Sequence, residues 1–368
     1  MNDRSRGLES MPIDGDAWDF GAAGGDFGND VPPPRITLLD AMLPGLRDEL
    51  ERGEPPIQWT PALEPWGAFA CRPHTVMVIG SPPATGKTSL VLDVVTRMQL
   101  RYQDLRVLVA SNEMRTAVMT ERIVSMHSGI QYGLLRNRDR SGYTAEDINR
   151  ASRVLDQIGP RLAFLERPFT LEQVHDAARQ HRADIVIVDF LQATGTAGSG
   201  TDVQQGVASV MRSLRALADS GPCVITTAAM SRQGIAHSRS RVGRTDVNET
   251  DMGVFLHASE IEHEADSAYL LLAESGAKVA VSPDEPYEPI RMWLQCVKAR
   301  DEAKVHVPLW FDGRFQKFSL RDVTKAKGST GRSTSPWISS PESKQPDSTA
   351  AKASRPPKKD KKNDPWLT

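Results

Sequence analysis

The 368-residue chain is 39% hydrophobic and carries a formal net charge of −2, which is enough apolar content to bury one large core or two small ones. No apolar run approaches the ~20 residues needed to span a bilayer, and the acidic, glycine-rich beginning is unlike a signal peptide, so a membrane-spanning or secreted protein is disfavoured and a soluble, cytoplasmic one is expected. The three cysteines, Cys71, Cys223 and Cys296, are far apart, which argues against a zinc site or a disulfide scaffold.

The two ends of the chain differ in charge from its middle. Residues 1–34 contain seven acidic residues against two arginines, whereas residues 323–368 contain ten lysines and arginines against four acids. Both segments have little apolar surface to bury, so we predict a disordered acidic head over 1–34 and a disordered basic tail over 323–368. The tail suits nonspecific DNA affinity, solubility or a partner contact equally well.

Residues 35–54 are predicted to form one amphipathic helix. Apolar residues recur there at helical spacing, at Ile36, Leu39, Leu43, Leu46 and Leu50. Pro44 lies inside the pattern, so the helix is expected to kink or to start there. Such a helix either packs on its own domain or docks on a neighbour, and composition alone favours the first.

Residues 55–322 alternate short apolar runs with helical patterns. Predicted strands lie at 76–80, 106–111, 161–166, 184–190 and 223–229, and predicted helices at 88–102, 145–158, 170–182 and 202–219. Buried strands joined by helical crossovers form a doubly wound, mostly parallel sheet flanked by helices, so we predict an α/β domain. Four more strands are expected at 267–274, 290–299, 304–311 and 313–320, the last two as a hairpin around Asp312-Gly313.

The stretch GSPPATGKTS, residues 80–89, nearly matches a phosphate-binding loop. It lies between an apolar strand and an amphipathic helix, where backbone N–H groups can surround an anion. Lys87 would reach the terminal phosphates and Thr88 would ligate Mg²⁺. The strict pattern has glycine at position 81, where this chain has Ser81. The alternative is a chance Gly-Lys-Thr at the start of a helix, and this context favours a nucleotide site. We therefore predict nucleotide contacts from Ser81, Pro82, Pro83, Ala84, Thr85, Gly86, Lys87, Thr88 and Ser89.

Two acidic residues are placed to complete a nucleotide site. Asp189 lies at the end of a predicted strand, where a carboxylate can order Mg²⁺. Glu113 follows another strand and could activate water as a general base. Each has a structural alternative: Asp189 could cap the next helix, and Glu113 could complement a helix dipole. Together with the loop at 80–89, the catalytic interpretation is favoured for both.

Seven segments occur in the order and approximate spacing of one known family. They are GSPPATGKTSL, SNEM (111–114), VDFLQ (188–192), VASVMRSLRALA (207–218), SEIEHEAD (259–266), VKAR (297–300) and FDGRFQKF (311–318). In these segments the chain resembles DnaB-type replicative helicases over residues 55–320. The resemblance implies a RecA-like ATPase domain of helicase superfamily 4 that uses ATP and Mg²⁺. That family typically has alanine at the position of Ser81, so the missing glycine is no objection.

The resemblance also implies roles for individual residues. Lys87 and Thr88 would hold phosphates and metal, Glu113 would activate water, and Asp189 would order the metal. Lys298 and Arg300 match the K-x-R element by which one subunit reaches the nucleotide of its neighbour, although their spacing alone suggests only a solvated strand end. Such an arginine can be worth ~10³–10⁵ in rate. A finger acting in trans requires a homo-oligomer, which the family forms as a ring, commonly a hexamer.

DNA contacts are expected in the loops after Asp189 and after the strand at 223–229. The second loop contains four basic residues without an interleaved acid, Arg232, Arg239, Arg241 and Arg244. Loops lining a ring channel would grip single-stranded DNA through its phosphates. The alternative is a mobile solvated loop, and no aromatic residue between these arginines indicates base stacking.

The chain departs from the family at several positions, and two of these departures bear most on function. The family usually ends the strand at 223–229 with Ser-Gln, whose glutamine senses the terminal phosphate, and this chain has Ala228 and Ala229. Only 75 residues precede the strand predicted at 76–80, too few for the family's helical N-terminal domain, which recruits primase. We therefore expect an ATP-dependent helicase, or alternatively a RecA-like DNA-binding ATPase that assembles or regulates without unwinding. The resemblance also favours residues 35–54 as a linker helix that docks on the next subunit.

Overall fold

The computed structural model describes residues 39–53, 56–61, 69–189, 203–231, 233–235, 252–255, 258–274, 287–300 and 304–321. The predicted acidic head and basic tail lie outside these residues. The chain divides into one unit of residues 1–56 and a second of residues 57–368. In the first, helix α1 spans Leu39–Arg52 with Pro44 inside it, so a helix forms within the predicted 35–54 and does not begin at the proline. Its action as a linker stays a prediction.

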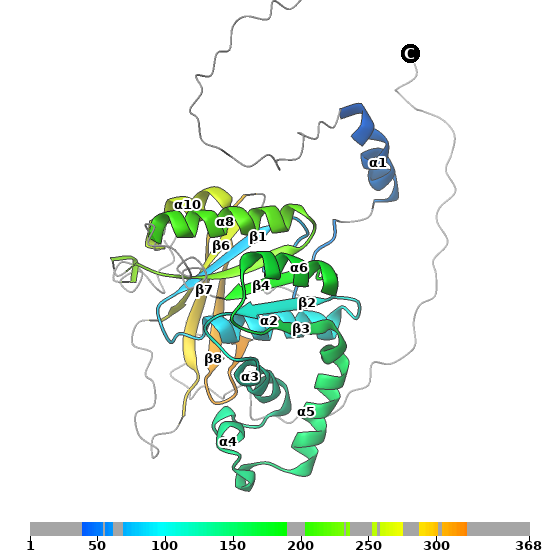
Figure 1. Cartoon of the computed structure of the whole chain (residues 1–368). Helices are drawn as coiled ribbons and strands as arrows, with labels where there is room; N and C mark the ends of the chain where they lie inside the picture. The colour runs from blue at the N-terminus through cyan, green and yellow to red at the C-terminus, as the bar shows by residue number, and fades with distance from the viewer. Residues whose placement is uncertain are drawn as a thin grey trace, which may run out of the picture. The chain divides into compact units, whose positions relative to one another are not determined.

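The second unit is built on one nine-stranded sheet with the order β3-β2-β4-β5-β1-β6-β7-β8-β9 (Figure 1). Neighbouring strands from β3 to β6 in this order are parallel, and β7, β8 and β9 extend the sheet antiparallel. The doubly wound, mostly parallel fold class is thereby confirmed. The strands are β1 (Val76–Ser81), β2 (Val107–Ser111), β3 (Leu162–Leu165), β4 (Ile185–Asp189), β5 (Cys223–Ala229), β6 (Ser267–Ala273), β7 (Ile290–Ala299), β8 (His306–Asp312) and β9 (Lys317–Leu320).

Helices cover both faces of this sheet because successive strand residues point to opposite faces. In β1, Met77 and Ile79 pack in a core with α2 and α3, whereas Val76 and Val78 pack in a second core with α6, α8 and α10. The helices are α2 (Lys87–Arg101), α3 (Thr116–Ser128), α4 (Tyr132–Asn137), α5 (Ala145–Ile158), α6 (Leu171–His181), α8 (Val203–Asp219) and α10 (Ala258–Glu264), with 3-10 turns at Arg140–Gly142, Gly159–Arg161 and Met252–Val254. No helix in the described part of the chain is both long and apolar enough to cross a membrane.

The last hairpin is wider than the predicted turn at Asp312-Gly313. Strand β9 begins at Lys317, which pairs with Asp312, so residues 313–316 form the turn. The Asp312 carboxylate accepts hydrogen bonds from the backbone N–H and the guanidinium of Arg314, at 2.8–3.1 Å. Gln316 takes a left-handed φ of 54°. These contacts favour the wider turn over continuous strand pairing.

Candidate functional site

Four neighbouring parallel strands, β2, β4, β5 and β1, end at one edge of the sheet. In an open α/β sheet, ligands bind outside the carboxyl ends of the strands. There Ser111 pairs with Asp189, and Ser81 pairs with Ala229. The predicted phosphate-binding loop connects β1 to α2 at this edge. The fold therefore collects three of the predicted segments, 81–89, 111–114 and the end of β4, in one place.

The loop between β1 and α2 adopts a compact conformation with two left-handed residues, Ala84 (φ 60°) and Gly86 (φ 92°). The hydroxyl groups of Ser81 and Thr85 both donate to the carbonyl oxygen of Pro82, at 2.9 and 2.6 Å. The left-handed φ of Gly86 favours glycine, and a Cβ there would also make a tight contact, 3.2 Å, with a ring carbon of Phe311. Ser81 fits the turn because its small side chain bonds within the loop.

Asp189 is the centre of the hydroxyl contacts at this edge. Its carboxylate is buried and accepts hydrogen bonds from Thr88 Oγ1 at 3.1 Å, Ser111 Oγ at 3.3 Å and Thr227 Oγ1 at 2.5 Å. Thr88 and Asp189, the two residues predicted to hold a metal, are thus in direct contact. Ser111 and Thr227 were not predicted, although a polar residue in an otherwise apolar buried strand is a usable signal.

Lys87 lies close enough to both acids for their charges to act on it. Burial lowers the pKa of Lys87, and the charges of Asp189 and Glu113 oppose that shift. The Glu113 side chain is exposed and lies before the first turn of α3, which contains no acidic residue, so Glu113 is outside the turn where a charge would complement the dipole of that helix. The Arg167 guanidinium donates to the Glu113 carbonyl at 3.3 Å and so holds the turn between β2 and α3 that carries Glu113. The role of Arg167 could not be predicted from its position in the sequence.

Ser89 contributes differently from the rest of the loop. Its side chain is fully buried, and its hydroxyl contacts Gln316 Oε1 at 2.8 Å and the Arg122 guanidinium at 2.9 Å. One turn along α2, the buried Asp93 accepts hydrogen bonds from Arg97 and from the backbone N–H of Phe318, all within 3.1 Å. Only the backbone N–H of Ser89 is therefore available to a nucleotide, while its side chain joins α2 to the β8–β9 turn.

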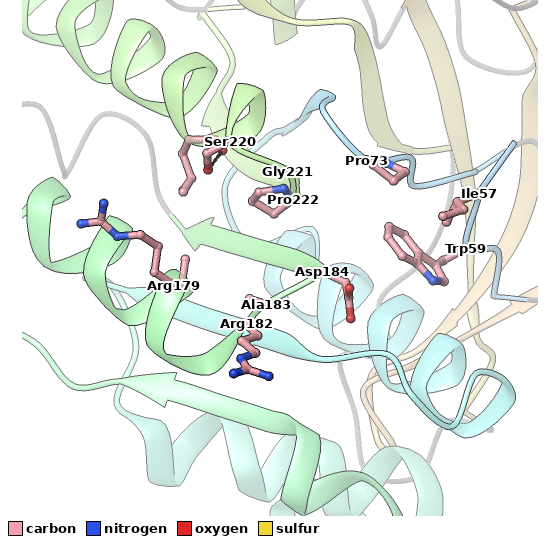
Figure 2. Close-up of a pocket in the computed structure, with 12 residues that line it drawn as sticks. Ile57, Trp59, Pro73, Arg179, Arg182, Ala183, Asp184, Ser220, Gly221 and Pro222 are labelled. Atoms are coloured by element: carbon pink, nitrogen blue, oxygen red, sulfur yellow. Dashed lines mark hydrogen bonds between the residues drawn. The ribbon is translucent and has the colours of Figure 1, made fainter. Parts of the chain in front are cut away.

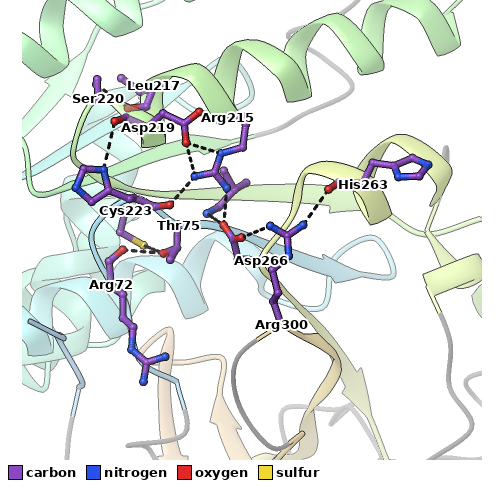
Figure 3. A network of polar contacts seen from close by, with 12 residues as sticks. Arg72, Thr75, Arg215, Leu217, Asp219, Ser220, Cys223, His263, Asp266 and Arg300 are labelled. Carbon is purple, nitrogen blue, oxygen red and sulfur yellow. Dashed lines mark hydrogen bonds and ion pairs between the residues drawn. The ribbon is translucent and has the colours of Figure 1, made fainter. Parts of the chain in front are cut away.

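Lys298 and Arg300 lie at the opposite edge of the sheet from Lys87. Strand β7 is antiparallel to β6, so its end lies beside Ser267 at the start of β6. Arg300 Nη1 donates to Asp266 Oδ1 at 2.9 Å, and the Lys298 ammonium donates to the Glu262 carbonyl (Figure 3 shows the Arg300 contacts). The six residues of β1 separate the two edges by about 17 Å, more than an arginine side chain spans. Within one copy, Arg300 cannot reach a nucleotide held by Lys87.

The predicted DNA-binding residues, Arg232, Arg239, Arg241 and Arg244, lie outside the described residues, as does the loop after Asp189. What the structure describes nearby is the end of β5. Ala228 is buried and Ala229 pairs with Ser81 at the carboxyl edge. Neither methyl group can hydrogen-bond a phosphate.

A separate cavity of about 330 Å³ lies at the amino ends of β4 and β5 (Figure 2). Its lining includes Asp184, Pro222 and the carboxyl ends of α6 and α8, together with Trp59. None of the residues predicted to bind nucleotide lines it. The cavity is therefore distinct from the cluster around Lys87 and Asp189.

The chain is similar to helicase domains in sequence and in fold. The model of the family described as DnaB-like helicase C terminal domain matches residues 70–320. A replicative DNA helicase DnaB from Nostoc sp. is 25% identical over 182 residues, which are 48% of this chain and 20% of that protein, so the chain spans about a fifth of this relative's length.

Two solved structures share the fold. One is described as an ATPase domain; it has a TM-score of 0.62 and 18% identity, and the match covers 78% of this chain and 100% of that chain. A DnaB-like replicative helicase, described with its interactions with primase, has a TM-score of 0.62 and 18% identity, and the match covers 77% of this chain and 69% of that chain. The RecA-like fold that the sequence predicts is thereby confirmed, and the family match supports an ATPase domain of the replicative-helicase type.

Proposed function

The chain belongs to the DnaB-like helicase C-terminal domain family, and from this premise we propose that it hydrolyses ATP as a ring-forming motor that moves along single-stranded DNA and unwinds duplex DNA in replication. The observation that carries the proposal is the 3.1 Å contact between Thr88 and the buried Asp189, with Lys87 beside them. A hydroxyl and a carboxylate joined next to a lysine on a helix N-terminus are the parts that phosphoryl transfer from a nucleotide requires.

The residues at the carboxyl edge fit ATP and Mg²⁺. Thr88 and Asp189 offer hard oxygen ligands of the kind that Mg²⁺ prefers, and bound Mg²⁺ would neutralise charge on the β- and γ-phosphates. The left-handed Ala84 and Gly86 are the kind of conformation in which successive backbone N–H groups would surround an anion, and Lys87 would add a positive charge. Glu113 is exposed beside this cluster, where its carboxylate would orient the attacking water and accept its proton.

Completion of the site requires a second copy of the chain. Because Lys298 and Arg300 lie about 17 Å or more from Lys87 within one copy, they would act on the nucleotide of a neighbour. A heterologous contact repeated around an axis forms a ring when the rotation closes and a filament when it does not, and we propose a ring of six. The DNA strand would pass through its centre, held by Arg232, Arg239, Arg241 and Arg244.

One observation favours a second candidate function. Ala229 stands where the family usually has a glutamine that senses the terminal phosphate, and it leaves no side-chain hydrogen bond for that task. Hydrolysis would then be less tightly coupled to DNA movement. The corresponding activity is a DNA-binding ATPase that assembles on single strands without unwinding duplexes.

The test measures ATP hydrolysis with and without single-stranded DNA, together with strand displacement from a forked duplex. We expect stimulation of hydrolysis by the single strand and displacement of the fork, both lost in Glu113→Gln, which preserves the size of the side chain and removes its charge. DNA-stimulated hydrolysis without displacement would favour the second candidate. Hydrolysis that single-stranded DNA does not stimulate, together with no displacement of a strand from the fork, would contradict the proposed motor function.

A further inference from the structure

Asp266, between α10 and β6, contacts three other segments that are far apart in the sequence (Figure 3). Its Oδ2 accepts hydrogen bonds from the backbone N–H of Val76 at 2.7 Å and from Arg215 Nη1 at 2.6 Å. Its Oδ1 accepts from Arg300 Nη1 at 2.9 Å. The side chain of Asp266 is only 15% exposed. Each carboxylate oxygen therefore has fixed partners, and one of the two oxygens serves Arg300.

The carboxylate is held in place independently of Arg300. Val76 is the first residue of β1, and its carbonyl in turn accepts the backbone N–H of Asp266 at 2.8 Å. Arg215 belongs to α8 and also contacts Asp219 at 2.9 Å. A strand in the middle of the sheet and a helix packed on it thus orient Asp266 before Arg300 is considered.

Arg300 is held on one side and open on the other. Its Nη2 donates to the His263 carbonyl at 3.2 Å, and its backbone N–H donates to the Asp266 carbonyl at 3.0 Å. The side chain is nevertheless 50% exposed. A guanidinium has five N–H donors, and the contacts within the described part of the chain use two of them. Donors remain for a phosphate outside this copy.

We propose that Asp266 is a positioning residue that holds the Arg300 guanidinium ready for the nucleotide bound by a neighbouring copy. The inference rests on the proposed function and adds to it a residue that is not itself in contact with nucleotide. An unheld arginine loses much rotamer freedom when it orders at an interface, whereas one already fixed by a buried carboxylate loses less. The charge of Asp266 also acts on Lys298: burial and the charge of Arg300 lower the pKa of Lys298, and Asp266 opposes that shift.

The first experiment measures kcat and the affinity for ATP in the assembled protein. Asp266→Asn, which preserves size and removes charge, is expected to lower kcat about tenfold with ATP affinity unchanged within about twofold. In an Arg300→Ala background the same substitution is expected to cause no further loss. The matched control is Asp219→Asn, the same change at the other acidic partner of Arg215, and it is expected to leave kcat unchanged. An unchanged or increased kcat on Asp266→Asn, or a further loss in the Arg300→Ala background, would overturn the proposal.

Mixed assemblies distinguish positioning in trans from damage to the same copy's own strand β1. Asp266→Asn protein is mixed with Lys87→Ala protein, which is inactive in its own phosphate loop and intact at Asp266. In an even mixture roughly a quarter of the interfaces combine an intact loop with an intact finger, so hydrolysis per Asp266→Asn subunit should rise. No rise would place the effect within one copy and overturn the inference.

The same mixing of Arg300→Ala with Lys87→Ala tests the proposed function separately. Restored hydrolysis in this control, without restoration for Asp266→Asn, would reject the role of Asp266 and keep the trans finger. No restoration in the control would reject the trans finger itself. If Asp266→Asn does not assemble, Arg215→Gln serves instead, because it removes one of the two contacts that orient Oδ2; a smaller loss of about threefold is then expected, and an unchanged kcat would overturn the proposal.

Discussion

Strand β1 has a different chemical environment at each of its ends. At its carboxyl end, Ser81 leads into the loop where Lys87, Thr88 and Asp189 meet, and the contacts there are hydroxyl groups bonded to one buried carboxylate. At its amino end, Val76 bonds a second carboxylate, Asp266, whose other partners are two arginines. The first end has oxygen ligands suited to a cation, and the second has exposed positive charge suited to an anion. In the ring proposed above, the second end of one copy would face the nucleotide bound at the first end of the next.

Lys87→Ala tests the carboxyl end and has the largest expected effect. The substitution removes a positive charge that acts on both Asp189 and Glu113, so nucleotide turnover should be abolished; loss of a single stabilising donor already costs about 10²–10³ in rate. Steady-state ATP hydrolysis measures the turnover, and calorimetry measures the affinity for the nucleotide. Turnover that survives in Lys87→Ala would show that the nucleotide lies elsewhere.

Arg300→Ala tests the amino end and should separate turnover from binding. We expect a loss in kcat of about 10³–10⁵, as for arginine fingers of other nucleotide hydrolases, with little change in ATP affinity because Lys87 and the loop remain. The control is Arg291→Ala, at an exposed arginine at the other end of β7, which should leave kcat unaltered. A large loss of ATP affinity in Arg300→Ala would contradict the division between the two ends.

The contacts between α2, which follows the phosphate-binding loop, and strand β9 should affect the stability of the fold and not only its activity. Asp93→Ala removes the buried carboxylate that bonds Arg97 and the Phe318 N–H. Breaking a buried pair costs about 3–5 kcal/mol of unfolding free energy, which urea unfolding would measure. Asp176→Ala, at a surface pair with Arg179, is the control and should change the free energy by less than about 1 kcal/mol. Equal losses of unfolding free energy in the two variants would show that the Asp93 carboxylate does not stabilise the packing of α2 against the last hairpin.

His127 should make the same region sensitive to acid. Burial lowers its pKa to about 4, and its Nε2 lies 2.8 Å from Thr96 Oγ1 on α2. The unfolded chain binds a proton near pH 6.5 and the native chain only near pH 4, so stability falls as pH decreases between these values, by about 3 kcal/mol in total. Urea unfolding at pH 7 and pH 4.5 measures the loss. His127→Gln should reduce the difference in unfolding free energy between pH 7 and pH 4.5. If the pH dependence is unchanged in this variant, groups other than His127 cause it.

The carboxyl end could be predicted from the sequence to a much greater extent than the amino end. The loop at 81–89 is contiguous, and Glu113 and Asp189 each follow an apolar run, so local pattern and strand order were sufficient. Asp266 gave no such signal, because its partners Val76, Arg215 and Arg300 lie 190, 51 and 34 residues away. Ser111 and Thr227 were missed although each is a polar residue in a buried strand, and Arg167 was missed because it contacts the Glu113 carbonyl from 54 residues away. Helix α3 was missed although Met119, Ile123 and Met126 recur at helical spacing.

The central claim is that a nucleotide bound by one copy is contacted by Arg300 of the next. Electron cryomicroscopy of the full chain with a non-hydrolysable ATP analogue and single-stranded DNA tests it most directly. The account predicts closed rings in which the analogue lies against Lys87 and Thr88, with Arg300 of the neighbouring copy within hydrogen-bonding distance of its terminal phosphate and still bonded to Asp266. Monomers, or rings in which Arg300 points away from every bound nucleotide, would contradict it.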